Sequence, residues 1–378
     1  MTAFGLTPEQ EKLLERARAI ARDHLKAVAG AGEPGRVNRP LVKALAAHDL
    51  LPRLFPRDAG GSREGAVSAM ELCLLREAIA HVSPEAETAL ALQGLGSYPI
   101  LQSGSDELVK RWIPGVAAGD AIAAFALTEP GAGSDAAAIA LRAEPDGDGF
   151  RLTGEKKWIS NAPDADVYVV FARTTEGAGA RGVTAFVVEG GSQGLTGRPL
   201  ELVAPHSIGS LTFDGVLVPG SRILGEKDRG FHVAMRTLDL FRPSVGAFTV
   251  GMAQAALDAS VAHASSRHAF GKPLKDLQAV SHRLADMATK LAAARLLVYR
   301  AASAYDAGET VTRASAMAKL YATEAAQEIV DAAIQIHGAS GLEKGHLLEH
   351  LYREVRSTRI YEGTSEIQRN IIARSLFG

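Results

Sequence analysis

Glycine is distributed unevenly along this 378-residue chain, and that unevenness limits what the chain can fold into. Residues 121–225 hold 16 glycines in 105 positions, whereas residues 226–378 hold 10 in 153. The glycine-rich stretch also carries β-branched and aromatic runs bounded by glycine, proline or aspartate, at Val167–Phe171, Val183–Val188 and Leu211–Val218. Such runs predict strands. The segment Asp146–Gly149 further predicts a hairpin turn. We therefore expect a compact β domain inserted between helical regions.

Helical periodicity occupies the rest of the chain. Before the β domain it covers residues 7–28, 39–50, 66–82, 85–103 and 106–118. After it, an apolar stripe recurs at three- and four-residue steps through Leu284, Met287, Leu291, Ala294 and Val298, which is typical of a bundle core. The predicted class is α+β. A helical N-terminal domain (1–120) precedes a barrel- or sandwich-like β domain (121–225) and a C-terminal four-helix bundle (226–378).

Composition excludes several classes of protein. Apolar residues make up 47% and charged residues 22%, as in ordinary soluble globular proteins. The formal net charge is −2, and no run of lysine and arginine indicates nucleic-acid binding. Cys73 is the only cysteine, which excludes an intrachain disulfide and fits a cytoplasmic location. The first residues lack a basic and apolar pattern, so no secretory signal is expected. The uncharged stretch Pro243–Leu257 is shorter than the roughly 20 residues that span a bilayer, so no membrane span is expected. No metal site is predicted.

One carboxylate near the end of the chain has an unusual setting. Glu362 lies between Tyr361 and Gly363, just before an apolar-periodic segment that contains Ile367 and Ile371. Apolar surroundings disfavour the charged form of a carboxylate and raise its proton affinity. A carboxylate becomes a useful general base near neutral pH in this way. A simple turn that enters a surface helix is the alternative interpretation.

Two further segments carry residues suited to a ligand. Thr128-Glu129-Pro130-Gly131-Ala132-Gly133-Ser134-Asp135 places small residues and a hydroxyl where backbone N–H groups can approach a phosphate or a carbonyl. In Leu152–Asn161, Trp158 and Ser160 lie two residues apart and hence on one face of a strand. An indole beside a hydroxyl suits a flat heteroaromatic ring, although a lone tryptophan is more often part of a core.

Together, these three segments resemble the acyl-CoA dehydrogenase family, FAD-dependent enzymes that carry the same motifs in the same order. Leu238–Pro243, Ser266–Lys272 and Gln335–Gly341 add to the resemblance, which covers essentially the whole chain. It implies α,β-dehydrogenation of an acyl thioester to the trans-2-enoyl thioester. Glu362 would remove the α-proton, and the β-hydrogen would leave as hydride to flavin N5. Some members place the base just before Arg242, but Phe241 stands there and cannot accept a proton.

The resemblance also assigns residues to ligands. The implied cofactor contacts are Phe125, Leu127, Thr128, Gly133, Ser134, Trp158, Ile159, Ser160, Arg267, Phe270, Gln278, Gln335, Ile336, Gly338, Thr364 and Glu366. The implied substrate contacts are Ser134, Asp239, Arg242, Gly363 and Arg374. Arg267, Phe270, Gln335 and Gly338 would hold the adenosine-diphosphate half of an FAD bound to the neighbouring subunit, which implies a homo-oligomer, a tetramer or a dimer.

Departures from the family pattern leave alternatives open. Glu201–Ser210 lacks the usual motif before the last long strand, so a carrier-protein thioester stands beside free acyl-CoA as substrate. Glu366 replaces a usual glutamine. Electron-transfer flavoprotein is the implied electron acceptor, while an oxidase that uses O₂ and a catalytically silent flavin-binding scaffold are the alternatives. Glu362 argues against nitroalkane oxidation, because those relatives carry aspartate there. No motif specifies the length or branching of the acyl group, or a place in fatty-acid or secondary metabolism.

Overall fold

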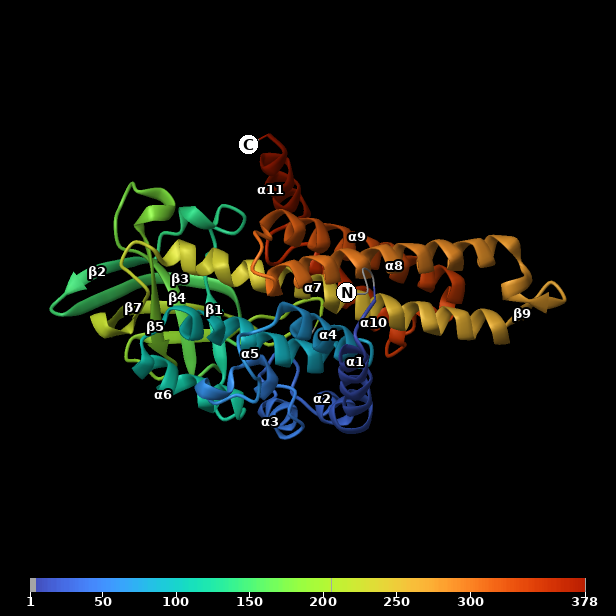
Figure 1. The fold of residues 1–378 in the computed structure, drawn as a ribbon, viewed down its shortest axis with the longest axis horizontal. Helices are drawn as coiled ribbons and strands as arrows, with labels where there is room; N and C mark the ends of the chain where they lie inside the picture. Colours follow the sequence, from blue (N-terminus) through green and yellow to red (C-terminus); the bar gives the residue numbers. More distant parts are fainter. Residues whose placement is uncertain (1–4, 205, 378) are drawn as a thin grey trace. The chain divides into compact units, whose positions relative to one another are not determined.

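The structure is a computed structural model that describes residues 5–204 and 206–377. The described chain forms two compact units, each drawn from separate parts of the sequence. We call residues 5–23, 68–87 and 239–377 the bundle unit, and residues 24–67, 88–204 and 206–238 the sheet unit. The expected order of a helical N-terminal region, a middle sheet and a helical C-terminal region is confirmed (Figure 1). The domain boundaries expected after residues 120 and 225 stay predictions.

An eight-stranded sheet organises the sheet unit. Seven strands follow the order β6-β7-β3-β2-β4-β5-β8, and β1 pairs in parallel with β4. The predicted strands are confirmed as β4, β5 and β7, and β2 and β3 form the predicted hairpin, with Asp146 opposite Gly149. The strands are β1 Ala123–Ala126, β2 Arg142–Asp146, β3 Gly149–Ser160, β4 Val167–Arg173, β5 Val183–Glu189, β6 Leu195–Pro199, β7 Ile208–Pro219 and β8 Ile223–Leu224.

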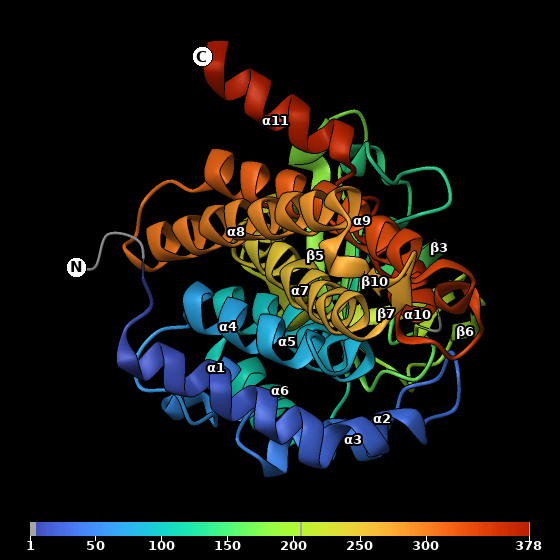
Figure 2. The same ribbon diagram turned by 90° about the vertical axis from the view of Figure 1, so that its right-hand side faces the viewer.

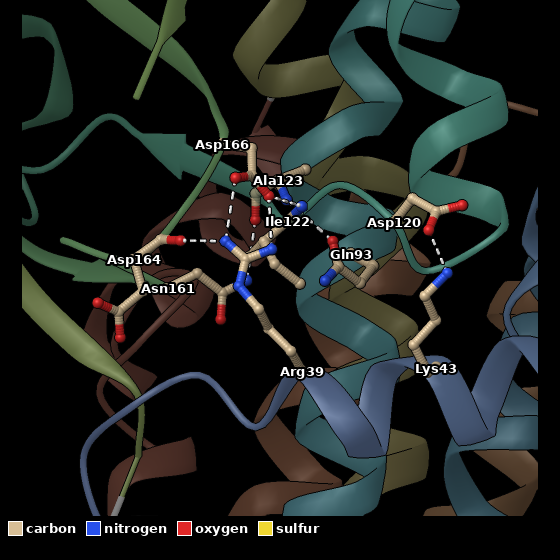
Figure 3. Close-up of polar contacts among 9 residues, drawn as sticks. All are labelled: Arg39, Lys43, Gln93, Asp120, Ile122, Ala123, Asn161, Asp164 and Asp166. Carbon is tan, nitrogen blue, oxygen red and sulfur yellow. Dashed lines mark hydrogen bonds and ion pairs between the residues drawn. The ribbon is translucent and has the colours of Figure 1, made fainter. Parts of the chain in front are cut away.

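Side chains from the helices of this unit secure the start of β1. Its helical elements include α2 (Lys26–Gly30), α3 (Arg39–Ala47), α6 (Asp106–Ala117) and most of α5 (Pro84–Ser103). Figure 3 shows Arg39 reaching from α3 to Asp166, at 2.9 Å, while Asp166 accepts from the Ile122 N–H at 2.7 Å. The Gln93 side chain accepts from the Ala123 N–H at 2.9 Å. These bonds hold the strand that leads into the Thr128 segment.

The bundle unit packs long helices around an apolar interior. The predicted stripe is confirmed on α8 at Met287, Leu291, Ala294 and Val298, which are buried, whereas its first member, Leu284, is half-buried. In both ribbon views α8 and α9 lie side by side (Figures 1 and 2). The helices are α1 Pro8–Ile20, α4 Ala69–Ala80, α7 Gly230–Ser266 from Asp239 onward, α8 Gln278–Asp306, α9 Thr312–His337, α10 Leu347–Thr358 and α11 Ser365–Phe377, and β9 (His268–Ala269) and β10 (Lys272–Pro273) form a hairpin.

Distant segments meet closely inside this unit. A Cβ at Gly246 of α7 would lie 2.7 Å from Val298 of α8, and one at Gly251 would lie 2.3 Å from the backbone oxygen of Glu77 of α4. The Asp306 carboxylate at the end of α8 accepts from the Ser68 hydroxyl at 2.5 Å and from the Ala69 N–H at 2.7 Å, so it caps the N-terminus of α4. The contacts that close the bundle therefore join residues far apart in the chain.

One helix among the described residues, α7, is long and apolar enough to pass a test for a membrane span. Within its most apolar window, 67% is buried inside the protein. Such burial is typical of the core helix of a globular unit, which meets the same criteria of length and composition.

Candidate active site

Glu362 lies in a tight turn between α10 and α11. Glu362 has φ +52° and Gly363 has φ +93°, so both adopt the left-handed conformation. A Cβ at Gly363 would lie 2.6 Å from Nε2 of Gln368, which explains why glycine follows the glutamate. The Thr364 hydroxyl accepts from the Ile367 N–H at 3.4 Å and so caps α11. The turn therefore leads into helix α11, as the alternative interpretation of this segment expected. It also holds Glu362 in a strained backbone conformation.

Two buried side chains hold this turn through its backbone carbonyls. Nζ of Lys319, on α9, donates to the Gly363 oxygen at 2.8 Å. Nε2 of Gln368, on α11, donates to the same oxygen at 2.9 Å and to the Glu362 oxygen at 3.2 Å. Neither side chain is exposed to solvent. The conformation of the turn is thus fixed by groups from two different helices.

The Glu362 carboxyl is partly desolvated and keeps one oxygen uncommitted among the described residues. It is half-buried, and its Oε2 is shielded from solvent without a hydrogen-bond partner among the described residues. Burial raises its pKa above the ordinary value, and the positive charges of Arg76, Lys319 and Arg242 oppose that rise. A carboxyl with raised proton affinity and one uncommitted oxygen has the properties of a general base.

The three cations that act on Glu362 come from three helices. Arg76 of α4 is buried, forms an ion pair with Glu87 and donates to Oγ of Ser244 at 2.6 Å. Arg242 of α7 is 5% exposed and lies 3.2 Å from Asp239. Asp239 and Arg242 were expected to contact the substrate; Arg242 acts electrostatically on Glu362, and Asp239 is its ion-pair partner. Burial lowers the pKa of Lys319 to about 8.

Three residues of this cluster escaped the sequence analysis, namely Arg76, Lys319 and Gln368. One signal was available for the first two. Arg76 interrupts an apolar helical run, and Lys319 lies among alanines. A charged residue on the buried face of a helix is rare unless it is paired or functional. Gln368 offered no comparable signal, because a glutamine near the end of a chain is usually a surface residue.

In the sheet unit, a buried ion pair supports the Thr128 segment. Nζ of Lys156 donates to Glu129 and to the Leu127 oxygen, both at 2.8 Å. The Glu129 carboxylate also accepts from the N–H groups of Ala140 at 2.6 Å and Leu141 at 3.0 Å. Every oxygen of this carboxylate is thus engaged within the protein. The sequence analysis singled out Thr128 as a cofactor contact. The ion pair of Glu129 with Lys156 supports the segment that carries it.

Trp158 lies at an irregularity in β3. The pairing register with β7 shifts between Lys156 and Ile159, and Trp158 has φ +56°. Its side chain is 44% exposed, whereas Ile159 is buried, so Trp158 is not a core tryptophan. The Thr128 oxygen accepts from the Lys157 N–H at 3.0 Å, which makes the two segments neighbours. The structure thus brings Thr128 and the Trp158 bulge together.

The other predicted cofactor residues of the sheet unit divide into packed and open positions. Phe125 packs on Phe171 with ring centroids 4.9 Å apart, and Leu127 is buried. Ser160 is half-buried. Gly133 and Ser134 are exposed, and a Cβ at Gly133 would meet no atom within 4 Å. Nothing in the described protein therefore requires a glycine at Gly133, which fits a backbone kept open for a ligand.

The remaining predicted residues lie on the surface of the bundle unit. Phe270, at the tip of the β9–β10 hairpin, is 91% exposed with φ +54°. Glu366 of α11 is exposed, and hydrogen bonds from its own backbone N–H and the Thr364 hydroxyl lower its pKa. Thr364 and Ile336 are half-buried, and the other exposed members are Arg267, Gln278, Gln335, Gly338 and Arg374.

Comparison with known proteins identifies the family. Three family profiles match: "Acyl-CoA dehydrogenase, N-terminal domain" over residues 7–120, the middle domain over 124–216 and the C-terminal domain over 228–377. The chain is 36% identical over 378 residues to cyclohexane-1-carbonyl-CoA dehydrogenase of Geobacter metallireducens, covering 99% of this chain and 98% of the relative. It is 38% identical over 376 residues to the caffeyl-CoA reductase-Etf complex subunit CarC of Acetobacterium woodii, covering 97% and 98%.

Solved structures are similar to this chain over its whole length. Butyryl-CoA dehydrogenase from Megasphaera elsdenii superposes with a TM-score of 0.94 at 33% identity, with both chains covered completely. PigA with FAD and proline superposes with a TM-score of 0.94 at 29% identity, covering 100% of this chain and 99% of PigA. The chain therefore belongs to the acyl-CoA dehydrogenase family and is a flavin-dependent oxidoreductase that acts on the CH–CH bond of an acyl-CoA.

Proposed function

We propose that this enzyme oxidises an acyl thioester to the trans-2-enoyl thioester, with Glu362 as the base that removes the α-proton. The observation that carries the proposal is the Oε2 of Glu362, which is buried and has no partner in the described part of the chain. Its raised pKa favours proton uptake. The backbone N–H of Glu362 is proposed to donate to the thioester oxygen, where negative charge develops.

FAD is the proposed cofactor, and when bound it accepts the β-hydrogen as hydride at N5. Residues of the sheet unit fit a flavin, because the half-exposed Trp158 offers a flat apolar face and Thr128 and Ser160 offer hydroxyls beside it. In the bundle unit, the exposed Arg267, Phe270, Gln335 and Gly338 are proposed to hold the adenosine-diphosphate half of an FAD bound to the neighbouring subunit. The exposed Gln278 and Glu366 and the half-buried Thr364 are further proposed cofactor contacts of this unit.

Ser134, Asp239, Arg242, Gly363 and Arg374 remain the proposed contacts of the substrate. The burial of Arg242 supports a second role for it, as a cation that favours the charged form of Glu362. Acyl-CoA is the leading substrate, and the unusual Glu201–Ser210 segment keeps a carrier-protein thioester as the second candidate. The relatives include proteins named as a dehydrogenase and as a reductase, so their names support both directions of the reaction.

Electron-transfer flavoprotein is the proposed acceptor, since the relative from Acetobacterium woodii is named as a subunit of a complex with it. A homo-oligomer, tetramer or dimer, is proposed because the bundle unit exposes large apolar side chains, among them Phe270 at 91% and Leu342 at 68%. The single cysteine, Cys73, is buried and free, which supports the proposal of a cytoplasmic enzyme.

The test is anaerobic reduction of the flavin-loaded protein by a series of acyl-CoA esters and one acyl-carrier thioester. We expect the oxidised-flavin absorbance to bleach with at least one thioester and the matching enoyl product to appear by mass spectrometry. Release of peroxide when air is admitted would identify an oxidase instead. A protein that binds FAD but is not bleached by any of these thioesters would be a scaffold, contrary to the proposal.

A further inference from the structure

Lys319 is a buried cation in an unusual position. It is on α9 and has no solvent exposure, and its ammonium donates to the Gly363 carbonyl at 2.8 Å. Within residues 5–204 and 206–377, no carboxylate forms an ion pair with it at 4.0 Å or less. A buried ammonium without a direct counterion is costly, so stability alone gives no reason to keep it.

The carbonyl that Lys319 holds belongs to the strained turn of Glu362. The left-handed φ at Glu362, which unlike Gly363 carries a Cβ, persists only if the surroundings impose it. Lys319 and Gln368 together place three hydrogen bonds on the two carbonyls of this turn. Gln368 also keeps its Oε1 buried without a partner among the described residues, which indicates that its amide is oriented by these carbonyls. We call Lys319 and Gln368 the turn clamp.

Hydrogen bonding alone does not require a lysine, because Gln368 shows that a neutral amide can hold the same carbonyl. What lysine adds is charge, and that charge acts on the Glu362 carboxyl. The other charged groups in these surroundings are Arg76 of α4 with its partner Glu87, Arg242 of α7 with Asp239, Glu324 of α9, Glu354 of α10 and Glu366 of α11. Arg76 and Arg242 each form an ion pair with a carboxylate, whereas Lys319 forms none with the residues that the structure describes.

We propose that Lys319 is a positioning residue for the reaction: with Gln368 it holds the Glu362 turn in its left-handed conformation, and its charge stabilises the carboxylate form of Glu362. The inference rests on the proposed role of Glu362 as the base. The turn clamp therefore has two functions: Lys319 and Gln368 both hold the turn, and Lys319 alone of the two supplies a positive charge.

Three variants separate these functions in the flavin-loaded protein. Lys319→Met removes both the charge and the donor, Lys319→Gln keeps a donor without charge, and Gln368→Leu removes a donor while leaving the charge. Lys290→Met is the matched control, because Lys290 of α8 is a half-exposed lysine paired with Glu328, outside this cluster. Hydrogen–deuterium exchange of residues 359–368 reports the order of the turn. Infrared difference spectra against Glu362→Gln follow the carboxyl titration, and the pH profile of kcat/KM follows the base.

Loss of a cation disfavours the carboxylate, so both Lys319 variants should move the carboxyl midpoint and the acid limb of kcat/KM upward by about one pH unit. Lys319→Met and Gln368→Leu should speed exchange of the turn, whereas Lys319→Gln and Lys290→Met should leave it near that of the wild type. In Gln368→Leu the midpoint should stay in place.

An unchanged midpoint in both Lys319 variants, or unchanged exchange in both Lys319→Met and Gln368→Leu, would overturn the inference. If Lys319→Met fails to fold, Lys319→Gln still tests the charge and Gln368→Leu still tests the donor. The infrared and exchange measurements need no turnover. A wild-type protein that is inactive on thioesters would therefore refute the proposed function while the clamp is still judged by these two measurements.

Discussion

Each of the two units buries one lysine completely, and the two lysines differ in their partners. Burial lowers the pKa of both Lys156, in the sheet unit, and Lys319, in the bundle unit, to about 8. Lys156 contacts the Glu129 carboxylate at 2.8 Å, and that carboxylate is further satisfied by two backbone N–H groups. Among the described residues, the Lys319 ammonium has one hydrogen-bond partner, a backbone carbonyl, and the carboxyl on which it acts keeps an oxygen without a partner there.

The difference separates a scaffold from a reacting group. A buried charge whose partners are complete has no capacity left for a ligand, and removing one partner leaves the other uncompensated. A buried carboxyl with an uncommitted oxygen lowers the stability of the folded protein but can take up a proton. The contrast predicts that similar substitutions in the two units have opposite consequences for stability and for activity.

The largest expected effect is on turnover in Glu362→Gln. The amide cannot accept the α-proton, and general bases typically contribute about 10²–10⁴-fold, so turnover should fall by that factor. Flavin content and thermal stability should stay near those of the wild type, because the change removes a desolvated acid. Stopped-flow bleaching and differential scanning fluorimetry measure the two properties. Retention of wild-type turnover would show that Glu362 is not the base that removes the α-proton.

The next effect is on stability, in Glu129→Gln. The substitution leaves Lys156 buried without its counterion, and breaking such a pair typically costs about 3–5 kcal/mol. Urea unfolding followed by circular dichroism measures the loss. A matched control is Lys43→Met, which removes the exposed pair of Lys43 with Asp120 shown in Figure 3 and should change stability by less than about 1 kcal/mol. An equal loss of stability in the two variants would show that burial does not determine how much these ion pairs contribute to the free energy of unfolding.

The smallest effect is a pH dependence of stability. Because burial lowers the pKa of Lys319 from its ordinary 10.5 to about 8, the unfolded chain holds more protons than the folded one between these values. The free energy of unfolding of the wild type relative to Lys319→Met should therefore rise from pH 8 to pH 10.5, by on the order of 1–3 kcal/mol. Urea titrations across this range measure it. A difference that stays flat would mean that the lysine is not desolvated.

Local patterns were sufficient to predict much of this fold. The β-branched runs predicted β4, β5 and β7, and the apolar stripe predicted the buried face of α8, because short-range periodicity decides both. Glu362 could be singled out from its neighbours in sequence. The turn clamp could not, because Lys319 reaches Gly363 across 44 residues of chain. The bulge at Trp158 depends on pairing with β7, which a single strand sequence does not specify.

The cap that Asp306 supplies to α4 has a consequence for biosynthesis. The Ser68 hydroxyl and its acceptor are separated by 238 residues, so α4 leaves the ribosome long before its cap exists. The sheet unit is complete in sequence at residue 238, whereas the bundle unit needs segments from both ends of the chain. Since domains generally fold as units during translation, we expect the sheet unit to become protease-resistant on nascent chains first. Arrest of translation at successive lengths, followed by limited proteolysis, would show whether α4 stays labile until the last helices emerge.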